Sequence, residues 1–225
     1  LDENKIFHSG AGRISRLKMN TMSLFESNDS SGDISIMDMY EGREIVKTVK
    51  KISLEELANL IIRGGWPANI NVAKDKYGLM PKYYINSILE KDIYESKNVD
   101  SVKMQKLLKS LARNETTVVS NNKLIKDISD NDDLNIDKRT VSDYIEILEK
   151  LNLFSNQLSY STNYRSPERV GKNVKRHFTD PSLAAALLNM NANKLIADLK
   201  TFGFLFEALV ERDLKIYMDY LDGNL

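Results

Sequence analysis

Three apolar stripes with helical spacing, followed by two strand-like segments, constrain the fold of this chain more than any other feature. Intervals of three and four residues place the apolar side chains of each stripe on one face of a helix. The stripes are formed by Met104, Leu107, Leu108 and Leu111, by Leu124, Ile125 and Ile128, and by Val141, Tyr144, Ile145, Leu148 and Leu151. Strands are expected next over 153–158 and 174–179. This order predicts a winged helix-turn-helix unit over about 97–176, although other small helical domains give similar stripes.

A capping signal and a pair of glycines delimit an earlier helix. Ser53 and Glu56 have the spacing of a capping box, in which each side chain bonds the other residue's backbone amide. Gly64-Gly65 predicts the end of that helix, and Trp66-Pro67 predicts a rigid turn after it. A further helix is expected over 81–94.

The two ends of the chain carry a mixture of strand and helix signals. The segment 177–180 is expected to be extended, and Asp180 followed by Pro181 is a favoured helix start. A long helix is predicted over 202–220, so that 177–225 resembles the opening of a nuclease-like α/β domain. Near the other end, a strand is expected over 12–23 with a polar loop after it. The predicted class is mainly α with minor β (α+β).

Composition excludes several classes of function. Lys plus Arg and Asp plus Glu are equal at 32 each, so bulk attraction to nucleic acid or to an anionic membrane is not indicated. The absence of cysteine rules out disulfides and thiolate metal sites and suits a reducing compartment. No apolar run approaches the roughly 20 residues that span a bilayer. A soluble, cytoplasmic protein without membrane contact is expected.

Motifs for a self-contained nucleotide or metal site are incomplete. Gly171-Lys172 is followed by Asn173 rather than Ser or Thr, so it does not complete a phosphate-binding loop. His8 and His177 are the two histidines, too few for a zinc site without several carboxylates. No metal site is predicted.

Charge gives a mixed indication of nucleic-acid binding. The predicted helix over 137–150 carries three basic and four acidic side chains, which does not suit a helix lying in the major groove. The ribbon that follows is basic, with Arg165, Arg169, Lys172, Lys175 and Arg176 against Glu168. These five residues are candidates for contact with phosphate. Alternatively, the ribbon faces an acidic neighbouring domain or is simply solvated.

Asp180 and Glu207 are candidates for an incomplete nuclease-like site. In nuclease-like folds, carboxylates of this kind gather a magnesium ion that activates water. The further strand Asp and the Glu-x-Lys that should follow them are absent from the sequence. Asp180 is also explained as a helix cap, and Glu207 as a structural residue, so catalysis by this chain alone is not expected.

The chain resembles a family of uncharacterised prokaryotic AAA+-type ATP-binding proteins, in which an ATPase core precedes a winged helix and a restriction-endonuclease-like domain of unknown function. The segments that carry the resemblance follow one another in the expected order over nearly the whole chain: 8–14, 22–27, 63–68, 111–114, 175–184 and 202–213.

The resemblance implies a division of the chain into four parts: the tail of the ATPase core over 1–39, a helical lid over 40–96, the winged helix over 97–176, and a truncated endonuclease-like domain over 177–225. It places the phosphate-binding loop and the acidic magnesium-binding strand outside these residues. ATP and Mg²⁺ are thus expected for the longer protein and not for this chain alone. Arg13 and Arg63 are implied to sense nucleotide phosphate; the alternative for each is an ordinary surface arginine.

Three functions are therefore considered. The first is a fragment of an ATPase that supplies its lid and winged-helix parts, whose partners are the missing core and the rest of the C-terminal domain. The second is a DNA-binding or nuclease-like module. The third is an interaction adaptor, with self-association through exposed apolar patches.

Overall fold

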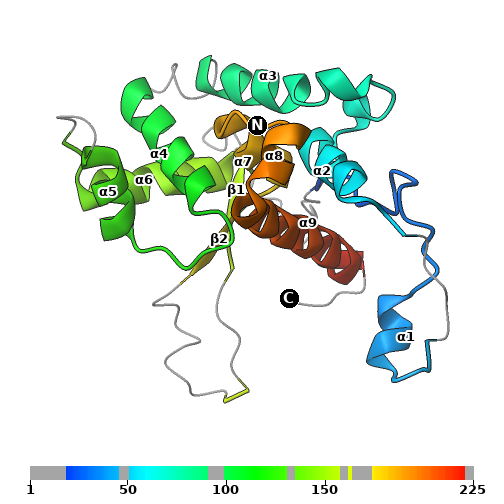
Figure 1. The fold of residues 1–225 in the computed structure, drawn as a ribbon. Coiled ribbons are helices and arrows are strands. Elements are labelled where there is room, and N and C mark those ends of the chain that lie inside the picture. The colour runs from blue at the N-terminus through cyan, green and yellow to red at the C-terminus, as the bar shows by residue number, and fades with distance from the viewer. Residues whose placement is uncertain are drawn as a thin grey trace, which may run out of the picture.

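A computed structural model describes residues 19–45, 51–90, 99–130, 135–157, 162–163 and 174–220. Within these ranges the protein is mainly helical with a small two-stranded antiparallel sheet, which confirms the expected α+β class at that level (Figure 1). The elements are α1 (Ile36–Tyr40), α2 (Leu54–Arg63), α3 (Leu79–Ile88), α4 (Ser101–Arg113), α5 (Asn121–Ser129), α6 (Lys138–Lys150), β1 (Phe154–Gln157), β2 (Lys175–Phe178), α7 (Pro181–Leu187), α8 (Ala192–Ala197) and α9 (Leu199–Tyr220).

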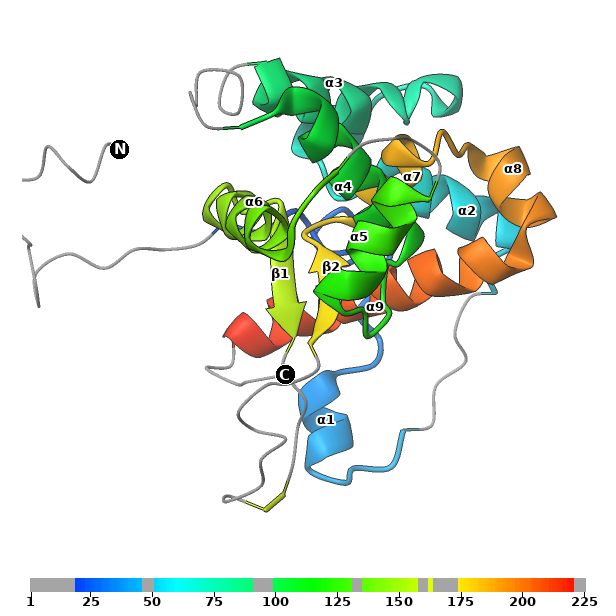
Figure 2. The ribbon, with the colours of Figure 1, turned by 90° about the vertical axis from the view of Figure 1, so that its left-hand side faces the viewer.

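The three predicted amphipathic helices, α4 to α6, pack on one another and on the hairpin of β1 and β2. Each begins at a side chain that accepts a hydrogen bond from the first turn: Asp100, Ser120 and Asp137. Their apolar stripes form a shared core in which Leu107, Leu124 and Leu148 are fully buried. Figure 2 views this unit from the side and shows β1 and β2 next to each other beside α5 and α6.

The hairpin is fixed by its register and by an aromatic pair. Phe154 faces Phe178 across the two strands, and their rings meet edge to face at 5.2 Å between centroids. Val118, in the segment between α4 and α5, forms an additional antiparallel bridge with Lys175. The chain after α4 therefore lies along β2, so that β2 has a neighbour on each side.

Helix α7 lies at the centre of the remaining elements and contacts α2, α3, α4 and α9. Its small residues Ala184 and Ala185 are buried, as is Leu183, and small side chains allow neighbouring helices to approach closely. Asp180 caps this helix and Pro181 occupies its first turn, as predicted. Helices α2 and α3 and the C-terminal helices thus share one core with the three-helix unit.

Several predicted elements differ from the observed ones. The strand expected over 12–23 is absent over 19–23, and residues 12–18 lie outside the described ranges. The helix expected over 81–94 begins earlier, at Leu79; its α-helical part runs to Ile88 and a π turn follows over 89–90, while residues 91–94 lie outside the described ranges. Helices α1 and α8 were not expected because five or six residues are too short for a periodic stripe; both start at a capping side chain, Ser35 and Asn191.

Candidate functional site

Arg63, the predicted nucleotide sensor, ends α2 and binds the segment that precedes α1. Its guanidinium donates to both carboxylate oxygens of Asp29, at 3.2 and 2.5 Å, and to Ser27 Oγ at 3.2 Å. Its Nε donates to the carbonyl of Gly64. Because Arg63 is only 4% exposed, the alternative of an ordinary surface arginine is wrong. A phosphate could reach this guanidinium only if Asp29 and its loop moved.

The two glycines after Arg63 allow four segments of the chain to meet. Gly64 has φ of +66°, and a Cβ built there would lie 2.5 Å from Asp180 Oδ1. A Cβ on Gly65 would lie 2.1 Å from the Met22 carbonyl oxygen, which is a severe steric clash. Met22 N donates to the Gly65 carbonyl at 2.7 Å. The paired glycines therefore end the helix and also let the backbone of 22–24 and the cap of α7 approach it.

Asp180 is fully buried and joins α2, α7 and α9. Its carboxylate accepts from Gly65 N at 2.9 Å, from the amide and hydroxyl of Ser182, and from Arg212 Nη1 at 3.0 Å. Burial alone would raise the pKa of Asp180, but the Arg212 guanidinium and the hydrogen bonds from Ser182 and Gly65 outweigh burial and lower it. Trp66 Nε1 donates to Ser182 Oγ, so that the turn after α2 contacts the start of α7 a second time.

Arg212 extends this buried junction to the N-terminal segment. Besides Asp180, it donates through Nε and Nη2 to Asp213 Oδ1 at 2.9 and 2.7 Å. The other oxygen of Asp213 accepts from the backbone amide of Leu24. Arg212 and Asp213 are both buried, so each charge is compensated by a partner rather than by water. We call the set Gly65, Asp180, Ser182, Arg212 and Asp213 the central junction.

A second buried cluster lies where the segment after α4 meets β2 and α9. Glu115 accepts from the Phe178 amide at 3.1 Å, and its Oε1 lies 3.5 Å from His177 Nδ1. His177 Nε2 lies 2.8 Å from Glu211, although neither ring contact has hydrogen-bond geometry. Burial raises the pKa of Glu115 to about 7. Burial would lower the pKa of His177, but the carboxylates of Glu115 and Glu211 outweigh it and raise that pKa.

This cluster makes stability depend on pH in a defined direction. Between pH 4.5 and about 7 the folded chain keeps the Glu115 proton that the unfolded chain loses, and above 6.5 folded His177 holds its proton longer than unfolded His177. Both effects lower stability as pH rises, and the change in the pKa of Glu115 alone corresponds to about 3 kcal/mol. Urea unfolding at several pH values should show this fall, and Glu115→Gln should flatten it. If the free energy of unfolding of Glu115→Gln fell with pH as steeply as that of the wild type, Glu115 would not be the source of the pH dependence.

Comparison with known proteins gives one match. The family described as a domain of unknown function (DUF8612) matches residues 54–194, well over half of the chain. The chain belongs to the DUF8612 family. No curated protein and no solved structure matches it. The matched range in this DUF8612 chain runs from α2 into α8 and contains Gly64, Gly65, Glu115 and Asp180, but Asp29 and Arg212 lie outside it.

The basic candidates for nucleic-acid contact are only partly described in this DUF8612 chain. Arg165, Arg169 and Lys172 lie outside the described residues, as does Arg13. Lys175 pairs with Glu207 and approaches Glu211 at 3.7 Å. Arg176 is buried and donates to Asn121 Oδ1 at 2.7 Å. The two described members of the basic ribbon are therefore engaged within the chain, which reduces their availability to phosphate.

The predicted nuclease-like pair is not gathered into one site. Asp180 belongs to the central junction, whereas Glu207 is exposed on α9 and binds Lys175. The described residues of this DUF8612 chain contain no group of three or more His, Cys, Asp or Glu side chains that could hold a metal ion. No described helix is long and apolar enough to cross a membrane.

Sequence reasoning missed Glu115, Glu211, Arg212 and Asp213. Glu115 follows a predicted helix in an unremarkable polar stretch, so its burial has no local signal. Arg212 and Asp213 had a weak local signal, because the charged run Glu211-Arg212-Asp213 lies between Val210 and Leu214 inside the predicted helix 202–220. Their roles arise from contacts made far along the chain.

A groove of about 610 Å³ lies between the segment 23–39 and the last turns of α9. Its lining is largely apolar and includes Phe25, Ile34, Met37 and Tyr217. Glu26, its acidic lining residue, already accepts from the amide and hydroxyl of Ser23. None of the described residues that line the groove is basic, so it does not suit a nucleotide phosphate.

Proposed function

We propose that this chain is the lid and winged-helix part of an AAA+-type ATPase and that it carries a conformational signal from the nucleotide to the C-terminal helices. The proposal starts from the resemblance of the sequence, which places the phosphate-binding loop upstream of residue 1. The observation that carries it is the position of Arg63: it is buried beside the central junction and bound to Asp29, in the segment assigned to the tail of the ATPase core.

The contacts around Arg63 suggest how such a signal is passed on. Asp29 and Ser27 hold the guanidinium in this structure, and phosphate oxygens are the ligands that compete best with a carboxylate for a bidentate arginine. Segment 22–24 is bonded both to Gly65 and to Asp213. Movement of the loop that carries Asp29 would therefore displace α2 and α9 together, because the same segment holds both.

Charge favours this proposal over nucleic-acid binding. The exposed face of α6 is neutralised within the helix by the pairs Arg139–Asp143 and Lys150–Glu146. Lys175 and Arg176 have partners inside the chain. Since phosphate neutralisation by free cations supplies much of nucleic-acid affinity, neither feature supports a DNA-binding surface.

The test compares Arg63→Met with Asp29→Asn in the protein expressed with the coding sequence that flanks it in its gene. Loss of the sensor guanidinium should lower the ATP turnover number by about 100-fold or more. Asp29→Asn removes the same ion pair but frees Arg63, so it should keep turnover within a few-fold of the wild type or raise it. A purely structural pair predicts equal loss in both variants, and absence of ATP turnover in the wild-type protein would overturn the proposed function.

A further inference from the structure

Gly203 has open space around it in the described part of the chain. It lies in the interior of α9, a helix of 22 residues, where glycine lowers helix stability relative to alanine. Gly203 is exposed, and a Cβ built on it would meet no other part of the chain within 4 Å. No turn or positive φ requires glycine there. The missing side chain leaves room on this face of α9 for the close approach of another group.

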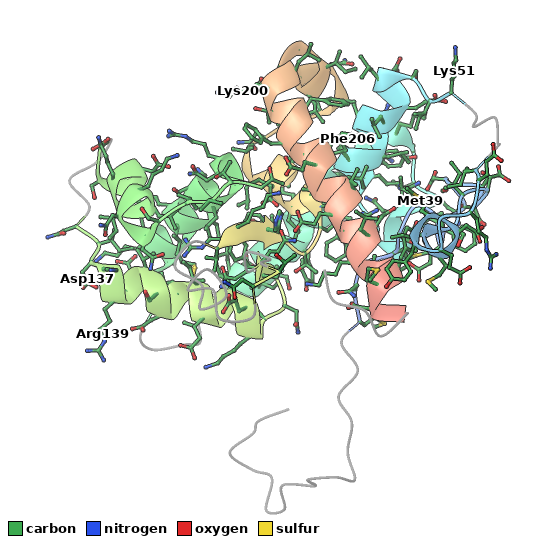
Figure 3. All side chains as sticks on the ribbon, turned by 90° about the horizontal axis from the view of Figure 1, so that it is seen from below. Met39, Lys51, Asp137, Arg139, Lys200 and Phe206 are labelled. Carbon is green, nitrogen blue, oxygen red and sulfur yellow. The ribbon has the colours of Figure 1, made fainter. Side chains whose placement is uncertain are left out.

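Gly203 stands in an exposed apolar stripe along α9. Leu199, Phe206 and Val210 have 64%, 40% and 41% of their surface exposed. Together with Gly203 they recur at intervals of four, three and four residues, which is the spacing of a helix-pairing seam. We call these four residues the α9 stripe. Figure 3 looks onto this side of α9, with Lys200 and Phe206 along it and no other described helix in front.

We propose that the α9 stripe pairs with the same stripe of a second copy, with the two helices antiparallel about a two-fold axis near residues 204 and 205. In this register Phe206 packs over Gly203 of the partner subunit, where the missing side chain leaves room for the ring. Leu199 then faces Val210 of the partner subunit. The surface is self-complementary, as a two-fold interface requires.

The charged residues beside the α9 stripe favour a second copy of this chain as the partner and an antiparallel orientation of the two helices. Lys200 and Glu207 occupy equivalent flanking positions, seven residues apart, and both are exposed. An antiparallel pair sets Lys200 against Glu207 of the partner subunit, twice by symmetry, whereas in a parallel pair this flank faces the opposite flank of the partner helix and forms no such charge pairs. Glu207 also binds Lys175 of its own chain, but 51% of its side chain is exposed. The seam is short compared with standard interfaces, so a weak dimer with micromolar affinity is expected.

Sedimentation of the 225-residue chain over low to high micromolar concentrations should show a monomer–dimer equilibrium that weakens with added salt. Gly203→Leu fills the space that receives Phe206 and should raise the dimer dissociation constant about tenfold or more. The same change should leave the Tm of dilute protein unchanged or a few degrees higher, because leucine favours the helix. Val102→Ala, at an exposed apolar residue of α4, is the matched control and should not affect dimerisation.

Charge reversal gives an independent test. Lys200→Glu and Glu207→Lys should each dimerise more weakly than the wild type, because each sets like charges together at both ends. Mixing the two variants should restore association, since every pair in the heterodimer is again opposite. A monomer at all concentrations, a dimer unaffected by Gly203→Leu, or a mixture no stronger than its components would each overturn the proposal.

Discussion

Arg212→Met is expected to lower the free energy of unfolding by about 3–5 kcal/mol, because it leaves the fully buried Asp180 carboxylate without its cation. The change also removes the partner that orients Asp213 toward the Leu24 amide. For a chain of this length the loss corresponds to a fall in Tm of roughly 6–20 °C. Thermal unfolding followed by circular dichroism measures it directly.

The matched control is Arg43→Met. Arg43 also pairs with two carboxylates, Asp38 and Glu41, but its side chain is 65% exposed. Removing it should change stability by less than about 1 kcal/mol, because water solvates the freed carboxylates. Combining Arg212→Met with Asp180→Asn should recover part of the loss, since no uncompensated charge then remains at Asp180. Equal effects of Arg212→Met and Arg43→Met would show that the central junction is not a buried charge network.

Gly65→Ala is expected to destabilise the fold by at least about 3 kcal/mol, although it adds a single methyl group. The new Cβ would lie 2.1 Å from the Met22 carbonyl oxygen, a backbone atom that cannot rotate away. Relief requires segment 22–24 to separate from Gly65, which breaks the bond from Met22 N and loosens the contact of Gly65 N with Asp180. Urea unfolding should show a lower midpoint.

Gly203→Ala supplies the comparison at a glycine with open space around it. It should stabilise dilute, monomeric protein by up to about 1 kcal/mol, because alanine is the better helix former and its Cβ meets no neighbouring atom. Replacing glycine by alanine is therefore expected to lower the free energy of unfolding at Gly65 and to raise it at Gly203. A loss at Gly203 as large as that at Gly65 would show that the close approach of Met22 is not what distinguishes the two positions.

Local sequence signals identified most of the regular structure. The stripe of Met104, Leu107 and Leu111 has the helical period, and these residues lie in α4 as predicted. The capping box of Ser53 and the Asp180–Pro181 start were also confirmed, because capping depends on residues within one turn. The described part of the strand expected over 12–23 is not a strand: within 19–23, Met22 N donates to the Gly65 carbonyl instead of to a neighbouring strand.

The sequence by itself determined where most of the longer helices and the two strands of this DUF8612 chain form, since helix period, caps and turn residues act over a few positions. Only the tertiary structure decided what the polar residues do. Asp180, Arg212 and Glu115 bind partners between 32 and 115 residues away, and their burial and charge state follow from those contacts. Pairing at that separation leaves no periodic signal in the sequence, because it depends on how the helices pack rather than on the residues beside each group.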